Sequence, residues 1–337
     1  MKNSQVRIID LFAGIGGMRL AAESAFGNER VHCVFTSEKD NAAVTVYQNY
    51  FCDDLGHEFN YDICDLYPDD LDSPGKSPRK TFADVPEHDL LLAGFPCQPF
   101  SMAGRRLGKS DERSLFDAIL QVIINASVKP KVLVLENVRG LKSIDGGETL
   151  REIVEALSEW YHVPEPQVLN ARDFGLPQNR NRLFIVGIRK DLRGAADYAF
   201  PDATHDRNET RVGHILDPNA DIELLTISDR LWEGHRKRRE RNVANGKGFG
   251  YRLVSPESNY TATLSARYYK DGSEILVEQY PQNPRKISVI EARNLQGFPK
   301  TFSPSSSKVQ AYKQFGNAVP VPVVAAILRS LASYLLA

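Results

Sequence analysis

The sequence predicts an α/β fold, a doubly wound mixed sheet, with a second, smaller and irregular domain. Two observations support this prediction. Apolar runs of strand length alternate with helical patterns from residue 6 to 188, as in doubly wound domains. From about residue 190 to 285 the alternation gives way to short polar pieces rich in Pro, Gly, Asn and Arg.

The first element is a short apolar strand, Val6 to Leu11, which runs into the glycine turn of residues 12–17 and then a helix over 18–26. The next strand, over 31–36, ends close to Glu38. Glycines permit close backbone approach and a carboxylate can accept ribose hydroxyls, so the arrangement indicates a nucleotide-type site. The third glycine directly follows the second, which favours an adenosine moiety without phosphates. A structural turn explains the glycines alone equally well.

Later elements continue the alternation: helices near 42–50, 115–126 and 150–161, and strands near Leu90, near Val132 and over 183–188. The tail, 319–336, returns to an apolar helical pattern, and we expect it to pack on the first domain. We therefore place the α/β domain at 1–189 plus 305–337 and the second domain at 190–304.

Two reactive side chains follow predicted strands. Cys97 lies in a Pro-flanked turn directly after an apolar run, and Glu136 follows the run of residues 131–135. The carboxyl edge of an open parallel sheet is where ligands bind. A thiolate and a carboxyl from neighbouring strand ends could add to an electron-poor ring and protonate it. A lone Cys is most often a small buried hydrophobe, but two bracketing prolines disfavour a packed strand interior.

Composition bounds the class of protein. The net charge of −1 hides an acidic stretch, 53–72, and a basic patch over 230–252 with eight Lys and Arg against two Glu. Such a patch is usually a solvated surface and less often a polyanion site. The four cysteines show no C-x-x-C spacing and no signal peptide precedes the first strand, so we expect a reducing cytoplasm. The apolar runs are too short for a membrane span, and the scattered histidines disfavour zinc.

Eight segments, in order, resemble the motifs of the DNA (cytosine-5)-methyltransferases of bacterial restriction-modification systems. Their spelling in this chain is Asp-Leu-Phe-Ala-Gly-Ile-Gly-Gly at 10–17, Glu at 38, Asp-Ile at 62–63, Gly-Phe-Pro-Cys-Gln-Pro-Phe-Ser at 94–101, Glu-Asn-Val at 136–138, Gln-Asn-Arg-Asn-Arg at 178–182, Arg-Asn-Leu-Gln-Gly-Phe-Pro at 293–299 and Gln-Phe-Gly-Asn-Ala-Val at 314–319. Only about 190–250 is not covered.

The resemblance implies a Rossmann-like methyltransferase fold and S-adenosyl-L-methionine as cofactor. It implies these cofactor-binding residues: Phe12, Gly14, Gly16, Gly17, Glu38, Lys39, Asp62, Ile63, Gly94, Pro96, Leu115, Asn317, Ala318 and Val319. The side-chain chemistry agrees, since Glu38 can accept ribose hydroxyls and Phe12 offers an aromatic face. We expect no metal, because the sulfonium is already an activated methyl donor.

The resemblance also implies the reaction, methylation of cytosine C5 in double-stranded DNA after the base is flipped out. Cys97 would add to C6, Glu136 would protonate or hydrogen-bond N3, and Arg182 would hold O2. Arg180 would steer Cys97 or a backbone phosphate. The segment 98–113 has the composition of a mobile loop over the DNA.

Residues 261–272 carry a Thr-Leu pair and clustered Arg, Tyr and Lys, and resemble the recognition region of the Dcm-like group, which modifies sites such as CCWGG, CCNGG or CCGG. We therefore interpret the second domain as a target-recognition domain. The candidate DNA contacts are Gln98, Ser101, Arg238, Arg239, Thr263 and Arg267.

We expect a monomer in the bacterial cytoplasm, nucleoid-associated on DNA, with a cognate restriction endonuclease as a functional rather than physical partner. One alternative is a tRNA cytosine-5 methyltransferase, but such enzymes lack the roughly 95 residues that here separate Arg189 from Arg285. A catalytically inactive DNA-binding homologue is the other, and the presence of Cys97, Glu136 and Arg182 argues against it.

Overall fold

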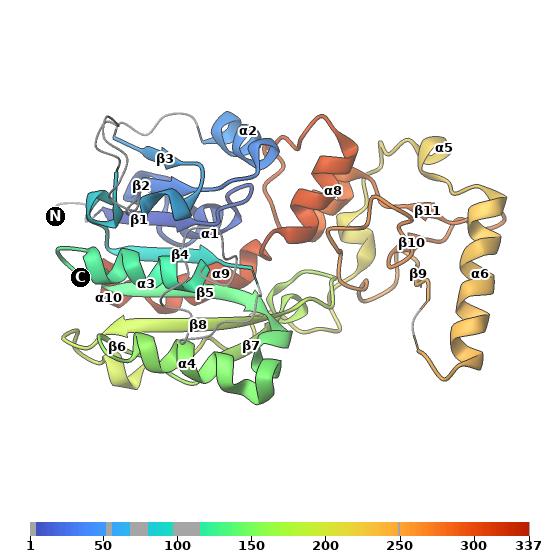
Figure 1. The fold of residues 1–337 in the computed structure, drawn as a ribbon. Helices are drawn as coiled ribbons and strands as arrows, with labels where there is room; N and C mark the ends of the chain where they lie inside the picture. The colour runs from blue at the N-terminus through green and yellow to red at the C-terminus, as the bar shows by residue number, and fades with distance from the viewer. Residues whose placement is uncertain (1–4, 52–55, 68–79, 97–114, 249, 337) are drawn as a thin grey trace, which may run out of the picture. The chain divides into compact units, whose positions relative to one another are not determined.

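A computed structural model describes residues 5–51, 56–67, 80–96, 115–248 and 250–336. The chain divides into two compact units (Figure 1). Unit 1 comprises residues 1–169, 181–201 and 324–337, and unit 2 comprises 170–180 and 202–323. The segment 170–180 therefore belongs to unit 2, although it precedes the predicted boundary at residue 189. The predicted functional division stays a prediction.

Unit 1 is built on a mixed sheet with the strand order β3-β2-β1-β4-β5-β8-β6, and β7 pairs with β8. The strands are β1 (Val6–Leu11), β2 (Val31–Ser37), β3 (Glu58–Asn60), β4 (Leu90–Gly94), β5 (Val132–Val138), β6 (Tyr161–His162), β7 (Gln167–Asn170) and β8 (Asn181–Arg189). The pairs from β3 through β5 are parallel, whereas β8 runs antiparallel to β5 and to β6. The predicted doubly wound mixed sheet is confirmed.

The helices of this unit are α1 (Gly17–Phe26), α2 (Asn41–Tyr50), α3 (Leu115–Asn125), α4 (Glu148–Leu157), α9 (Val321–Ser330), whose first turn belongs to unit 2, and α10 (Ala332–Leu335). The predicted helix over 150–161 ends earlier, because Tyr161 begins β6 and pairs with Arg189. No helix in the described part of the chain is long and apolar enough to cross a membrane.

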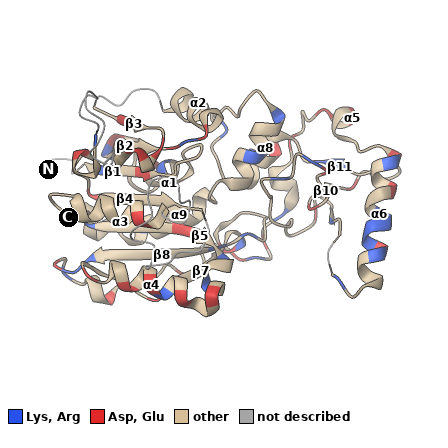
Figure 2. Cartoon of the chain, in the orientation of Figure 1, with Lys and Arg blue, Asp and Glu red and all other residues tan. Residues whose placement is uncertain are grey.

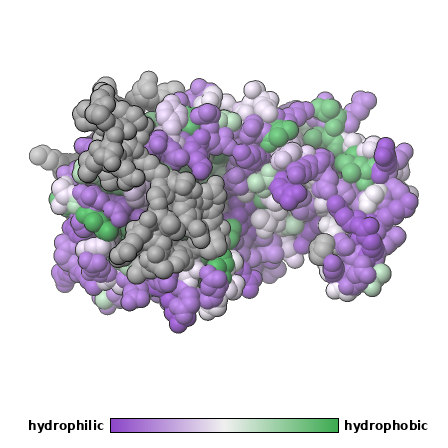
Figure 3. Space-filling view, in the orientation of Figure 1, coloured by the Kyte–Doolittle hydropathy of each residue, from purple (hydrophilic) through white to green (hydrophobic). Residues whose placement is uncertain are grey.

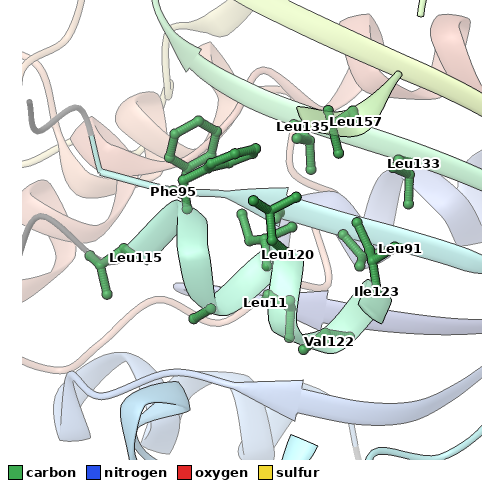
Figure 4. Packing of buried hydrophobic residues seen from close by; sticks show 14 of the residues in the cluster. Leu11, Leu91, Phe95, Leu115, Leu120, Val122, Ile123, Leu133, Leu135 and Leu157 are labelled. Carbon is green, nitrogen blue, oxygen red and sulfur yellow. The ribbon is translucent and has the colours of Figure 1, made fainter. Parts of the chain in front are cut away.

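The main apolar core lies between the sheet and α3 (Figure 4). Alternate residues of the strands point to this face, among them Leu11, Leu91 and Leu133, and meet Leu120 and Ile123 of α3. All five side chains are nearly inaccessible to solvent, and each contributes roughly 1.5–3 kcal/mol to folding by its burial. This packing fixes the strands whose carboxyl ends carry the predicted site.

Unit 2 holds α5 (Ile222–Leu225), α6 (Asp229–Ala244), α7 (Val289–Leu295), α8 (Lys308–Asn317) and a small sheet of β9 (Leu253–Val254), β10 (Leu276–Val277) and β11 (Arg285–Lys286). The 16-residue helix α6 lies where only short polar pieces were expected. Only His235 and Asn242 of α6 are buried, so no apolar stripe marks the helix in the sequence. Its Ser228 cap, which accepts from the Leu231 N–H, is the remaining local signal.

Candidate active site

The glycine turn connects β1 to α1 through left-handed backbone conformations. Phe12 has φ +57°, Gly14 +56° and Gly16 +83°. A Cβ on Gly16 would lie 2.2 Å from Cε2 of Phe51, so this glycine is required both by its φ and by packing against the end of α2. A Cβ on Gly14 would meet no described atom within 4 Å, which leaves space beside the turn. Gly17 is buried as the first residue of α1.

Glu38, which follows β2, is tied to this turn by its carboxylate. Oε2 accepts from the Gly14 N–H at 2.8 Å, and Oε1 accepts from the Asp40 N–H at 2.7 Å. Each oxygen keeps a second lone pair, so the carboxylate is oriented and can still accept a hydroxyl. Lys39 is exposed beside it.

Two further predicted cofactor residues open the short helix η2 (Ile63–Leu66). Asp62 caps it, since its Oδ1 accepts from the Cys64 N–H at 3.0 Å. Ile63 is 2% exposed and belongs to the core of unit 1. Both side chains therefore have a structural role, in capping η2 and in the core, besides their predicted contact with the cofactor.

The proposed acid Glu136 lies at the carboxyl end of β5, beside the end of β4. It is in register with Gly94, and a Cβ on Gly94 would lie 3.6 Å from its Oε2. Asn137 fixes the neighbouring backbone by donating from Nδ2 to the Phe95 carbonyl at 3.1 Å. The chain then leaves β4 through the exposed Pro96.

Glu136 forms an ion pair with Arg182. The Arg182 Nε lies 2.9 Å from Oε1 of Glu136, and the side chains are 14% and 10% exposed. The pair forms because β8 is antiparallel, which sets Arg182 opposite Val138 at the carboxyl end of β5. Burial lowers the pKa of the guanidinium, and Glu136 opposes that effect. A carboxyl and a guanidinium at this edge can together bind a donor–acceptor edge such as that of a pyrimidine.

Arg180 is a buried residue of unit 2. Its Nη1 donates to the Leu264 carbonyl at 3.0 Å, and its Nη2 donates to the carbonyls of Gly316 at 2.8 Å and Ala318 at 2.7 Å. The side chain is fully buried, so its hydrogen bonds hold three stretches of unit 2 together. Arg180 thus has a structural role. The sequence had predicted only that it steers Cys97 or a phosphate.

The other predicted residues are distributed as follows. Leu115, at the start of α3, is 9% exposed in unit 1. Asn317 ends α8 and is exposed, with the half-buried Ala318 and the buried Val319 after it, all in unit 2. The predicted nucleophile Cys97 and the predicted DNA contacts Gln98 and Ser101 lie outside the described residues.

Several Lys and Arg residues lie along α6 (Figure 2), and its two predicted DNA contacts, Arg238 and Arg239, have different surroundings. Arg238 is engaged within unit 2, with Nη1 2.8 Å from Oδ2 of Asp271 and Nη2 3.1 Å from Nδ1 of His235. Although burial raises it, the pKa of Asp271 is lowered to about 2 by the hydrogen bonds from Arg238 and Ser273. Arg239 is exposed.

The predicted recognition segment, residues 261–267, is held mainly through backbone atoms. The Thr261 N–H donates to the Pro177 carbonyl at 2.8 Å, and the Asn179 N–H donates to the Thr261 carbonyl at 3.0 Å. A Cβ on Gly316 would lie 2.4 Å from the Ser265 carbonyl, so α8 approaches this backbone as only glycine permits. The Thr263 hydroxyl donates to the Asn179 carbonyl at 2.6 Å, whereas the Arg267 side chain is exposed.

One acid of unit 1 was not predicted from the sequence. Asp10 of β1 is fully buried, and neither of its carboxylate oxygens has a hydrogen-bond partner in the described part of the chain. Burial raises its pKa to about 7, Arg19 of α1 lowers it and Glu38 raises it further. In the sequence, the only indication of this buried acid was a single Asp within the largely apolar run of residues 6–11. The described residues contain no group of three or more His, Cys, Asp or Glu able to hold a metal ion.

Comparisons with known proteins place the chain in a family. Residues 6–333 match the profile of the family described as C-5 cytosine-specific DNA methylase. The Type II methyltransferase M1.ScrFI of Lactococcus lactis subsp. cremoris is 46% identical over 332 residues, which cover 98% of this chain and 79% of that relative. The Type II methyltransferase M.NlaX of Neisseria lactamica is 47% identical over 326 residues, 96% of each chain.

The fold has solved counterparts as well. The crystal structure of the S. pombe Dnmt2 methyltransferase is similar with a TM-score of 0.72 at 18% identity, covering 98% of this chain and 99% of that one, which shows a shared fold. The predicted family is thereby confirmed by the sequence comparisons and the predicted architecture by the structural one. The chain belongs to the C-5 cytosine-specific DNA methylase family and is a DNA (cytosine-5-)-methyltransferase.

Proposed function

We propose that this enzyme methylates C5 of one cytosine in a short double-stranded DNA sequence, through a covalent bond between Cys97 and C6 of the flipped-out base. The ion pair of Glu136 and Arg182 is the observation that supports it best, because it lies beside Gly94, three residues before Cys97. Relatives named Type II methyltransferases support a role in protecting DNA from a cognate restriction endonuclease.

The family uses S-adenosyl-L-methionine as methyl donor, and the residues of unit 1 fit its adenosine part. Glu38 presents an oriented carboxylate for ribose hydroxyls, and the space beside Gly14 leaves room at the turn. Phe12 would offer its ring, and Ile63 and Asp62 would line the adenine. When bound, the cofactor supplies an electrophilic methyl group.

The chain's own residues would perform the remaining chemistry. The Cys97 thiolate adds to C6 while Glu136 gives a proton or hydrogen bond to N3, which makes C5 nucleophilic. Arg182 holds the O2 atom with N–H groups other than Nε, which remains on Glu136. After C5 has taken the methyl group, it releases its proton to solvent, the Cys97 sulfur leaves C6, and N3 returns to Glu136 the proton that it received. The products are 5-methylcytosine, the free thiolate and the demethylated cofactor.

Transfer of a radiolabelled methyl group to duplex DNA and to tRNA tests the substrate. We expect label in DNA only, and label in tRNA alone would overturn the proposal in favour of a tRNA methyltransferase. Bisulfite sequencing of DNA from a host that expresses the chain would then identify the modified cytosine. If neither the DNA nor the tRNA is labelled although the protein binds DNA, the chain is an inactive homologue.

The covalent step needs its own test. Duplex DNA with 5-fluorocytosine at the target should trap the wild type in a denaturation-resistant adduct, because C5 then has no proton to lose. Cys97→Ser should abolish both trapping and turnover. Cys33→Ser is the matched control, since the Cys33 thiol is fully buried and burial raises its pKa to about 11. An adduct with Cys97→Ser would refute the assignment of the nucleophile.

We propose further that residues 190–304 read the sequence, with the exposed Arg267 reaching a base edge. Arg267→Ala should cost about 1–3 kcal/mol of binding at the cognate site and little at scrambled duplexes. An equal loss on both duplexes would show that Arg267 positions the DNA instead of reading it.

A further inference from the structure

Three arginines of unit 2 lie over tyrosine rings. The guanidinium carbon of Arg239 is 4.9 Å from the centroid of the Tyr251 ring, and those of Arg252 and Arg172 are 4.4 Å and 3.9 Å from the centroid of the Tyr260 ring. We propose that these five residues form an arginine–tyrosine track that binds the phosphodiester backbone of duplex DNA. The choice of DNA rests on the proposed function, whereas the track itself rests on the contacts below.

The track carries three positive charges. None of the three guanidiniums has a carboxylate partner among the residues that the structure describes. Five other basic side chains of unit 2 do have one, and the pairs are Arg207 with Asp173, Arg236 and Lys237 with Glu233, Arg238 with Asp271, and Arg285 with Glu291. A phosphate can therefore approach the track without breaking an ion pair, and charge-assisted bonds from Arg to phosphate are among the strong ones.

The ring of Tyr251 is held in place by its neighbours. Trp232 of α6 packs edge-on against the Tyr251 ring, with 4.6 Å between the ring centroids. A Cβ on Gly250 would lie 3.0–3.4 Å from Cγ, Cβ and Cα of Arg239, so the chain runs closely against α6 at this point. These contacts hold the ring under the Arg239 guanidinium, which reduces the freedom that a flexible arginine loses on binding.

Positive charge is concentrated at Tyr260. Two guanidiniums lie over one ring, and Arg172 is also restrained by its Nη2, which is 3.5 Å from the Arg207 carbonyl. A hydrogen bond from Arg252 and the charges of Arg252 and Arg172 lower the pKa of the Tyr260 hydroxyl. Like charges that share a ring repel each other, so an anion between or beside them is favoured.

The two rings are also linked through the chain. Tyr251 and Arg252 are consecutive, so the residue after the first ring supplies a cation to the second. Figure 3 shows mostly hydrophilic residues over α6, the helix that carries Arg239. Successive phosphates of one DNA strand require such a series of cations, not a single one.

The salt dependence of DNA binding tests the track. Arg239→Gln, Arg252→Gln and Arg172→Gln should each lower the slope of log Kd against log salt concentration, by up to about 0.9 for each phosphate that the arginine neutralises in the wild type. The loss of affinity should be the same on cognate and scrambled duplexes, because phosphates carry no sequence. Arg207→Gln is the matched control, since it removes the same charge from an arginine that already has a carboxylate partner.

The role of the ring needs a second pair of variants. Tyr260→Phe keeps the aromatic face and should bind DNA within about twofold of the wild type. Tyr260→Leu removes it and should weaken binding about two- to fivefold for each guanidinium that the ring supports. Circular dichroism of every variant verifies folding.

Unchanged slopes for all three track variants, or an equal change in the control, would overturn the track. Equal binding by Tyr260→Phe and Tyr260→Leu would remove the role of the ring. These results are distinct from failure of the proposed function, which is measured as absence of methyl transfer by the wild type. Binding measurements need no turnover, so the track is tested in either case.

Discussion

Replacing Asp10 by asparagine removes a buried carboxyl directly before the glycine turn. Asp10 is in register with Thr36 of β2 and Leu92 of β4, so its side chain cannot reach solvent without disrupting the sheet. Because burial raises the pKa of this carboxyl to about 7, the folded protein keeps a proton that the unfolded chain releases near pH 4.

The sign and size of the effect follow from that difference. The pKa rises by about three units, and each unit corresponds to 1.36 kcal/mol, so the pH-dependent contribution is at most about 4 kcal/mol. The stability that the protonated Asp10 contributes is fully present below pH 4 and is lost as the pH rises to about 7. Asp10→Asn lacks this dependence, although its buried amide costs about 1–3 kcal/mol at every pH.

The measurement is the free energy of unfolding in urea, followed by circular dichroism at pH 4.5, 6, 7 and 8. The variant should gain stability relative to the wild type as the pH rises, and the gain should level off above about pH 8. Asp65→Asn, on the exposed side of η2, reports the effect of losing a carboxylate from the surface. A difference between Asp10→Asn and the wild type that is constant with pH would refute the buried, protonated carboxyl.

Three further predictions concern other residues. Glu136→Ala and Arg182→Ala should each lower the free energy of unfolding in urea by about 3–5 kcal/mol, because each leaves a buried charge without its partner. The double variant should lose clearly less than the sum of the two single losses, and additive losses would disprove the coupling. Glu38→Gln should weaken cofactor binding about tenfold or more in calorimetry, because a charge-assisted hydrogen bond contributes roughly 1.5–3 kcal/mol, and an unchanged Kd would exclude the ribose contact. Burial lowers the pKa of His88 to about 4, so stability should fall as the pH drops from about 6.5 to 4, and His88→Gln should lessen that fall.

The sequence was most informative where chemistry and local pattern coincide. Glu38 was predicted from its spacing after the glycines, and the structure ties it to Gly14. Glu136 and Arg182 came from separate motifs, and their ion pair follows from the antiparallel β8, a relation that the order of motifs does not contain. Sheet order is set by packing of the whole domain, so no local pattern could supply it.

Long-range partners account for most of what was missed. Arg180 was expected to act on Cys97 or phosphate, yet it donates to carbonyls 84 to 138 residues away. Arg238 was predicted as a DNA contact, and the structure adds an internal partner, Asp271, which is 33 residues away. A basic residue looks the same in sequence whether its partner is internal or a ligand, and only the fold distinguishes the two cases.

Given the proposed role of residues 261–267 in reading the target site, their backbone attachment bears on how new DNA specificities could be obtained. Hydrogen bonds between main-chain atoms at 177–179 and 261 do not depend on which side chains the segment displays. The exposed position of Arg267 can therefore vary in evolution, or in a library, while the segment stays anchored. A transplant of the whole segment from a relative is more demanding, since the acceptor must offer a glycine at position 316 and an arginine at position 180. Under the proposed role, point substitution within the segment is therefore a simpler way to change the target site than exchange of the whole segment.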